Sequence, residues 1–201
     1  MARPRTFEET TALDAAIGCF WRRGYEATSV RDLAAAMGIS GTSLYNTFED
    51  KHALFVRALE RYMDSAARER IARLEKSLPP KAAIHKFIGG VIDRSVDDPD
   101  RRGCFLINSA LEVAPHDPKL GAEIAARLGE IEQFFHRMIV AGQADGTIAR
   151  ARDPSDMARL LLGILLGIRV LARTNPDRAL LEGMARPALA LLEETNEERK
   201  A

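Results

Sequence analysis

Apolar residues recur at helical spacing along nearly the whole chain. Val30, Leu33, Ala34 and Met37, for example, follow the i, i+3, i+4, i+7 pattern of one face of a helix. Similar stripes, bounded by Gly, Pro and capping residues, predict about nine helices. The expected helices cover approximately residues 6–24, 29–37, 40–48, 50–74, 81–96, 103–114, 118–144, 154–172 and 187–194. The pattern therefore predicts an all-α fold.

The stretch 28–51 contains the most closely spaced helix signals in the chain. Thr28 or Ser29 can accept hydrogen bonds from the first backbone N–H groups of a helix. Gly38 can adopt the left-handed conformation that ends this helix, and Ser40 can cap the next one two residues later. Two short helices joined by such a tight turn form a helix-turn-helix, in which the second helix can enter the major groove of DNA.

The outer face of the second short helix carries Thr42, Ser43, Tyr45 and Asn46. Short hydrogen-bonding side chains and a phenol can reach base edges or phosphate oxygens. The alternative is an ordinary helical hairpin inside a core. The near absence of Lys and Glu on this face, where a solvated helix usually carries them, favours the DNA-binding interpretation.

The string GISGTSLYNTFEDK (residues 38–51), followed by ALFVRAL (residues 53–59), resembles the TetR/AcrR family of transcriptional regulators. The resemblance implies that Tyr45 and Lys51 contact DNA phosphates and that Thr42, Ser43 and Asn46 face bases. We add four residues to the candidate DNA contacts: Arg3 and Arg5 on an N-terminal arm, and Thr28 and Arg31 near the first helix of the motif.

The total charge of the chain gives no support for DNA binding. Residues 1–51 carry six basic and seven acidic side chains, and the whole chain has a formal charge of +0 and a pI near 6.9. DNA affinity must therefore come from the placement of charges and from doubling the binding site in a dimer.

Composition excludes several other classes of protein. The chain has 201 residues, of which 46% are hydrophobic, and this is enough for a sizeable core. No signal region is visible, and the longest apolar run, 160–168, is too short to span a bilayer, so we expect a cytoplasmic protein without membrane contact. Two distant cysteines, Cys19 and Cys104, indicate neither a disulfide framework nor a zinc site, and we expect no cofactor.

The expected helix 103–114 differs from its neighbours by a polar seam. Phe105, Asn108, Ser109 and Glu112 share one face, and buried polar groups there require partners. The seam therefore faces solvent, forms internal hydrogen bonds or lines a ligand cavity. The resemblance favours the cavity, since family members bind small molecules between these helices. The candidate ligand-binding residues are Tyr62, Phe87, Cys104, Phe105, Asn108, Glu112, Phe134 and Met138.

Cys104 is also a candidate sensor of oxidants or electrophiles. It lies in the expected first turn of the helix 103–114, just after Gly103, and Arg101 and Arg102 precede it; both features favour the reactive thiolate. The alternative is a small hydrophobic residue packed beside Phe105. Cys19, in the middle of the first helix, has neither feature.

The segment MARLLLGILLGIRVLA (residues 157–172) is apolar almost all round. Such a helix must be buried on several sides, and glycines four residues apart allow another helix backbone to approach closely. We predict a homodimer interface built from the last two helices, with Leu162, Gly163, Leu166, Gly167 and Leu189 as its residues; the alternative is a core within one chain.

Together these features predict two domains, with residues 1–51 reading DNA and residues 52–201 binding a ligand and dimerising. The expected function is that of a ligand-responsive transcriptional regulator, a repressor that binds a two-fold-symmetric double-stranded DNA operator and is released by a small molecule. The alternatives are a helical interaction module and an enzyme using the polar seam. The enzyme is disfavoured because the seam shows no nucleophile–base–orienter set, so we expect no catalytic residues.

Overall fold

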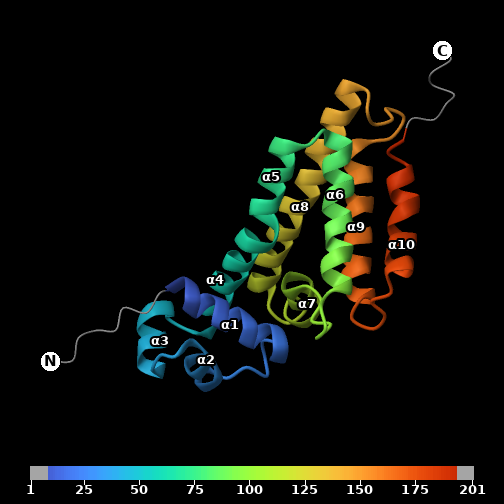
Figure 1. Ribbon diagram of the computed structural model, residues 1–201. Coiled ribbons are helices and arrows are strands. Elements are labelled where there is room, and N and C mark those ends of the chain that lie inside the picture. Colours follow the sequence, from blue (N-terminus) through green and yellow to red (C-terminus); the bar gives the residue numbers. More distant parts are fainter. Residues whose placement is uncertain (1–8, 194–201) are drawn as a thin grey trace, which may run out of the picture.

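The computed structural model describes residues 9–193, and every regular element in this range is helical (Figure 1). The all-α prediction is confirmed. In chain order the elements are α1 (Glu9–Arg23), α2 (Val30–Met37), α3 (Gly41–Phe48), α4 (Lys51–Met63), the π-helical segment η1 (Asp64–Arg68), α5 (Glu69–Ser77), α6 (Pro80–Val96), α7 (Phe105–Glu112), α8 (Pro118–Asp145), α9 (Pro154–Leu171) and α10 (Arg178–Ala190).

Helices α1, α2 and α3 form a small N-terminal unit at one end of the molecule (Figure 1). Ser29 and Asp32 form a capping box at the start of α2, in which the serine hydroxyl accepts from the Asp32 N–H at 3.1 Å. Gly38 ends α2 in the left-handed conformation with φ 67°, which a side chain would disfavour. Ser40 then caps α3 by accepting from the Ser43 N–H at 3.0 Å. The turn forms where the sequence predicted it.

Helices α4 and α5 form one continuous rod with η1 between them, so the number of helical rods in residues 9–193 agrees with the prediction. The rod leads from the N-terminal unit to the rest of the molecule (Figure 1). The π-helical turn in its middle was not expected. Arg68, at the end of this turn, pairs with Glu60, with Asp64 at 2.9 Å and with Glu130 of α8 at 2.6 Å. This network ties the rod to the body of the protein.

The helical body consists of α6, α8, α9 and α10, which run side by side, with α7 at the end nearest the N-terminal unit (Figure 1). Its apolar faces form a continuous core with those of α1–α5. Helix α7 contacts α1 and α4 on one side and α8 and α9 on the other. It therefore sits at the junction between the two parts of the molecule.

The last helix corrects our prediction, because it begins at Arg178 and not at Pro187. The Asp177 carboxylate caps it by accepting from the Leu180 N–H at 2.8 Å. Pro187 lies inside the helix on an exposed face. Its ring removes the hydrogen bond to the carbonyl four residues earlier, at the exposed Gly183, where water can satisfy that group.

Candidate DNA interface and ligand cavity

The exposed face of α3 presents Thr42, Tyr45 and Asn46 together. Tyr45 is 51% exposed, an unusual fraction for an aromatic side chain. The opposite face of the helix is fixed, because Leu44 and Phe48 are fully buried. This arrangement gives a short, rigidly anchored helix whose outer face carries hydrogen-bonding groups, as groove reading requires.

Ser43 is half-buried and its hydroxyl lies 2.9 Å from that of Ser40. A hydroxyl has one donor and two acceptor sites, so this pairing leaves Ser43 capacity for two further hydrogen bonds. Lys51 opens α4, and its ammonium lies 4.3 Å from the centre of the Tyr25 ring. A cation–π contact of this kind holds the lysine beside α3 without neutralising it.

Thr28 does not fit the role predicted for it. Its side chain is completely buried, and its hydroxyl donates to the carbonyl of Gly24 at 2.6 Å. The residue therefore closes the turn after α1 and has no surface for DNA. Arg31 is exposed at the start of α2, whereas Arg3 and Arg5 lie outside the described residues.

An ion pair joins the end of α1 to the start of α2, with Arg23 2.6 Å from Asp32. Hydrogen bonds from the Ser29 hydroxyl and backbone N–H, together with Arg23, lower the pKa of Asp32 to about 2. The carboxylate therefore stays ionised at any physiological pH and keeps the capping box closed.

The polar seam of α7 is satisfied by internal hydrogen bonds. Ser109 donates to the carbonyl of Phe105 at 2.8 Å, and the side-chain amide of Asn108 donates to the carbonyl of Arg102 at 2.8 Å. Glu112 accepts from the backbone N–H of Glu26 at 3.3 Å. The same residues line a space of about 350 Å³ between α1 and α7. The seam thus connects the N-terminal unit to the body. Two of the three predicted alternatives, internal hydrogen bonds and the lining of a cavity, therefore apply together.

Cys104 is the residue before α7, and it is half-buried. The hydroxyl of Tyr62 donates to its Sγ at 3.4 Å. Burial raises the pKa of Tyr62, and the neighbouring Cys104 raises it further. The phenol therefore stays protonated and keeps its O–H donor. Tyr62 and Phe105 pack edge to face with ring centres 5.6 Å apart. These three predicted ligand residues therefore lie together.

Phe87, Phe134 and Met138 do not belong to this group, and they line none of the described cavities. Phe87 and Phe134 are 2% and 0% exposed, and their rings lie 5.0 Å apart in the core between α6 and α8. Met138 packs against the same core. These side chains face inward, as the helical spacing predicted, and they pack against other core side chains.

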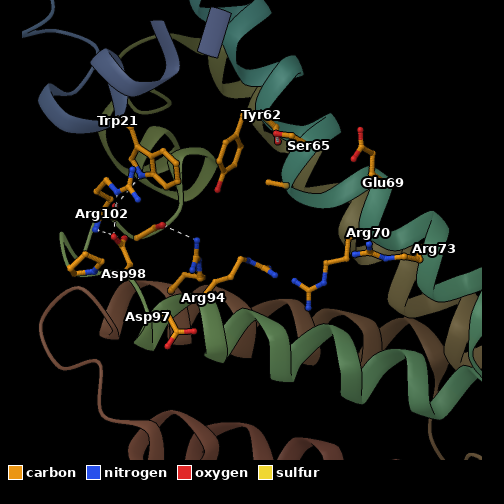
Figure 2. Close-up of a pocket in the computed structure, with 14 residues that line it drawn as sticks. Trp21, Tyr62, Ser65, Glu69, Arg70, Arg73, Arg94, Asp97, Asp98 and Arg102 are labelled. Atoms are coloured by element: carbon orange, nitrogen blue, oxygen red, sulfur yellow. Dashed lines mark hydrogen bonds and ion pairs between the residues drawn. The ribbon is translucent and has the colours of Figure 1, made fainter. Parts of the chain in front are cut away.

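The largest described cavity, about 460 Å³, opens between the α4–α5 rod and the ends of α6 and α9 (Figure 2). Trp21, Tyr62 and Ala66 form an apolar part of its wall. The π-helical turn η1 contributes to this wall, and π turns occur frequently at functional sites. Among the predicted ligand residues, only Tyr62 lines this cavity. Five arginines also line it: Arg70, Arg73, Arg94, Arg102 and Arg169.

Arg102 connects this cavity to α1. Its backbone carbonyl accepts from the indole N–H of Trp21 at 3.1 Å, and its guanidinium lies 4.8 Å from the centre of the indole ring. Asp98 holds the loop by accepting from the Arg102 N–H at 2.8 Å and from its side chain at 3.3 Å. The loop between α6 and α7 is therefore attached directly to the N-terminal unit (Figure 2).

Sequence reasoning missed the five arginines because they come from four separate segments of the chain. One signal was available: Arg169 is the only charged residue in residues 160–172. A lone charge in an apolar helix is buried with partners or serves a function. Here Arg169 is 9% exposed and donates to Ser95 at 3.0 Å and to the carbonyl of Gly103 at 2.8 Å.

The predicted dimer face is partly exposed. Gly163 is exposed with no atom near the position of an added Cβ, whereas Leu162, Leu166 and Leu189 are half-buried. Gly167 is approached by Met184 of the same chain, so α10 already packs beside this glycine. The large apolar residues Leu160, Val170 and Leu180 remain exposed on α9 and α10.

Residues 9–193 contain no cluster of three or more His, Cys, Asp or Glu side chains able to hold a metal ion. No helix among them is long and apolar enough to cross a membrane.

Comparisons with known proteins agree with this geometry. Residues 12–58 match the model of bacterial regulatory proteins of the tetR family, and residues 80–187 match the tetracyclin repressor-like C-terminal domain. The chain is 32% identical to the uncharacterized HTH-type transcriptional regulator YezE of Bacillus subtilis over 96% of this chain and 100% of that protein. It is 31% identical to the HTH-type transcriptional repressor ComR of Escherichia coli over 94% and 90% of the two chains.

Among solved structures, a cysteine mutant of the TetR family transcriptional regulator CifR complexed with 26-bp double-strand operator DNA is similar, with a TM-score of 0.84 and 30% identity. The match covers 95% of this chain and 100% of that one. Two matching family models, over residues 12–58 and 80–187, and relatives aligned along nearly their full length leave one conclusion: the chain belongs to the TetR family of transcriptional regulators.

Proposed function

We propose that this regulator is a cytoplasmic repressor that binds a two-fold-symmetric operator as a homodimer and is released by a small molecule. In this proposal residues 1–51 read DNA and residues 52–201 bind the ligand and dimerise. The observation that carries the proposal is the exposed face of α3, where Thr42, Tyr45 and Asn46 lie on a helix fixed by two buried side chains. The repressor ComR and the operator complex of CifR support it.

Dimerisation is supported by the exposed apolar side chains of α9 and α10, since large apolar groups on a surface favour association. It is also needed for specificity, because one short reading helix contacts only a few base pairs. Release is supported by the position of the cavity, whose wall includes Trp21 of α1. A ligand that fits one arrangement of the two reading units better than the other shifts the population between them.

A catalytic role has no support at the polar seam. The hydroxyl of Ser109 is bonded to a backbone carbonyl, and Glu112 accepts from a backbone N–H. A nucleophile needs a base within hydrogen-bond reach, and no histidine fills that role beside Ser109 among the described residues. We therefore propose that the chain is not an enzyme.

The test is a selection of operators from random duplex DNA, with the enriched sites sequenced. We expect a site with two-fold symmetry. The variants Tyr45→Ala and Asn46→Ala are then compared on the best site with Leu111→Ala, which removes an exposed side chain from α7. Loss of a good base contact costs about 1–3 kcal/mol, or about ten- to a hundredfold in affinity, whereas the control is unchanged. Enrichment of no sequence, or equal binding by all three variants, would refute the proposal.

A further inference from the structure

The wall of the large cavity is strongly cationic although the whole chain has a formal charge of +0. Five arginines line it, against the three carboxylates of Glu69, Asp97 and Asp98. The arginines come from α5, the end of α6, the loop that follows α6, and α9. Four separate segments therefore bring positive charge to one place.

Two of these arginines face each other across the cavity. Figure 2 shows the guanidinium groups of Arg70 and Arg94 pointing toward one another. Arg70 donates from one nitrogen to the carbonyls of Lys86 and Phe87, at 3.1 and 2.5 Å, while its Nη1 is buried without a partner. Arg94 is exposed and has neither an ion pair nor a hydrogen bond with any of residues 9–193. The opposed pair thus has free donors and no carboxylate in direct contact with it among the described residues.

The carboxylates of the wall do not supply this counter-charge. Asp98 is engaged by Arg102, whose backbone and side chain both donate to it. Glu69 and Asp97 project away from the space between the two guanidinium groups (Figure 2). Asp93 attracts both arginines from a distance, but its carboxylate is paired with Arg178 at 2.8 Å, so the positive charge between α5 and α6 is only partly compensated.

The electrostatics of the pair are unfavourable as it stands. Burial lowers the pKa of Arg70 to about 10, and repulsion from Arg94 and Arg73 adds to the shift. The pKa of Arg94, whose side chain still reaches solvent, is lowered by partial burial and then by Arg169. An anion between the two groups would relieve this repulsion and satisfy the free N–H groups, since a guanidinium matches the planar fork of a carboxylate.

The rest of the wall is suited to an apolar group. Trp21 and Tyr62 stand at one end of the cavity, and Ala66 lies beside them on the rod. A volume of about 460 Å³ falls within the range of small-molecule sites. The cavity therefore offers a cationic end and an aromatic end.

We propose that the cavity binds a small organic acid whose carboxylate lies between Arg70 and Arg94 and whose apolar body packs against Trp21 and Tyr62. The inference rests on the proposed function, because it gives the chemical class of the effector. Occupancy would contact the N-terminal unit directly, since Trp21 belongs to α1.

Trp21 provides the measurement, because it is the single tryptophan of the chain and lines the cavity. Its fluorescence is titrated with benzoate, phenylacetate and hexanoate, and with the neutral amide of each. We expect at least one acid to bind with a Kd below about 1 mM and at least about 10-fold more tightly than its amide, because charge-assisted hydrogen bonds are stronger than neutral ones. Added salt should weaken the acid alone.

The variants Arg70→Gln and Arg94→Gln should each weaken binding of that acid by about 10-fold or more, whereas Arg94→Lys retains part of it. Arg137→Gln is the matched control, because Arg137 is exposed on α8 and pairs with Glu75 outside this cavity. Thermal unfolding without ligand checks folding. Arg94→Gln should match or exceed the wild-type Tm, since it removes a like charge.

The proposal is overturned if no acid changes the fluorescence up to about 10 mM, if amides bind as tightly as acids, or if both glutamine variants bind the acid like the wild type. Operator binding on the same preparations separates this inference from the proposed function. Acid binding by a protein that selects no DNA supports the acid site and refutes the repressor. Operator binding by a protein that binds no acid supports the repressor and refutes the acid site.

Discussion

Replacing Lys51 by Met tests the DNA interface most directly. Lys51 is the first residue of α4, and its ammonium is held 4.3 Å from the Tyr25 ring centre, beside the reading helix α3. A phosphate contact from this position reads no sequence but releases counterions. Methionine keeps the length and apolar stem of the side chain, so the change removes little more than the charge.

The size of the effect follows from the number of phosphates lost. Each phosphate contact contributes about 0.9 to the slope of log affinity against log salt, so a dimer that loses two contacts changes its slope by about 1.8. Salt is raised fourfold, from about 50 to 200 mM, and the loss of affinity is measured for each protein. The factor by which Lys51→Met loses affinity should be about ten times smaller than the factor for the wild type. Loss of the cation–π contact should lower the free energy of unfolding by only about 0.5–1 kcal/mol.

The assay is an operator titration by fluorescence anisotropy at several salt concentrations, on the selected operator and on sequences with single mismatches. Lys76→Met is the control, because Lys76 is exposed on α5, far along the rod from α3. All sequences should weaken alike. An unchanged slope, or a change in which operator is preferred, would show that Lys51 does not act through a phosphate.

Three further predictions concern other parts of the molecule. Gly163→Gln should reduce dimerisation measured by sedimentation, because the side chain meets nothing within the chain but would block a partner helix; Gly129→Gln, equally open on α8, should not. Asp32→Asn should lower the urea midpoint near neutral pH, and the difference should disappear as the pH falls from about 4 through 2, because the depressed pKa stabilises the fold only above this window. Cys104, half-buried, should react with iodoacetamide faster than the buried Cys19, and equal rates would contradict its placement.

Local signals in the sequence were sufficient for the helix-turn-helix. Ser29, Gly38 and Ser40 act on backbone groups within a few residues, so their effect does not depend on the rest of the fold. The last helix shows the limit of the same reasoning. Pro187 resembles a first-turn proline, but Asp177 provides the actual cap ten residues earlier. A proline on an exposed face is tolerated inside the helix, which the local pattern does not reveal.

The cavity could not be predicted in this way. Helical spacing shows that Phe87 and Phe134 face inward, but a core and a cavity wall have the same spacing. Which of them a residue joins depends on what the neighbouring helices place opposite it. Arg70 lies in α5 and Arg94 lies near the end of α6, so they are far apart in the sequence. Their charges come close only after α5 and α6 have packed.

Two hydrogen bonds to one carbonyl join the loop beside the cavity to α1 and α7. The carbonyl of Arg102 accepts from both Trp21 of α1 and Asn108 of α7, at 3.1 and 2.8 Å. Each such bond contributes about 0.5–1.5 kcal/mol, so a ligand that moves this loop can change the relative stability of two arrangements by only about 1–3 kcal/mol per protomer. One protomer then supplies about 5- to 150-fold in operator affinity. Two protomers acting together multiply their factors if their effects are independent. Strong release of the operator therefore requires that both cavities of a dimer be filled, and the release should depend more steeply than linearly on ligand concentration.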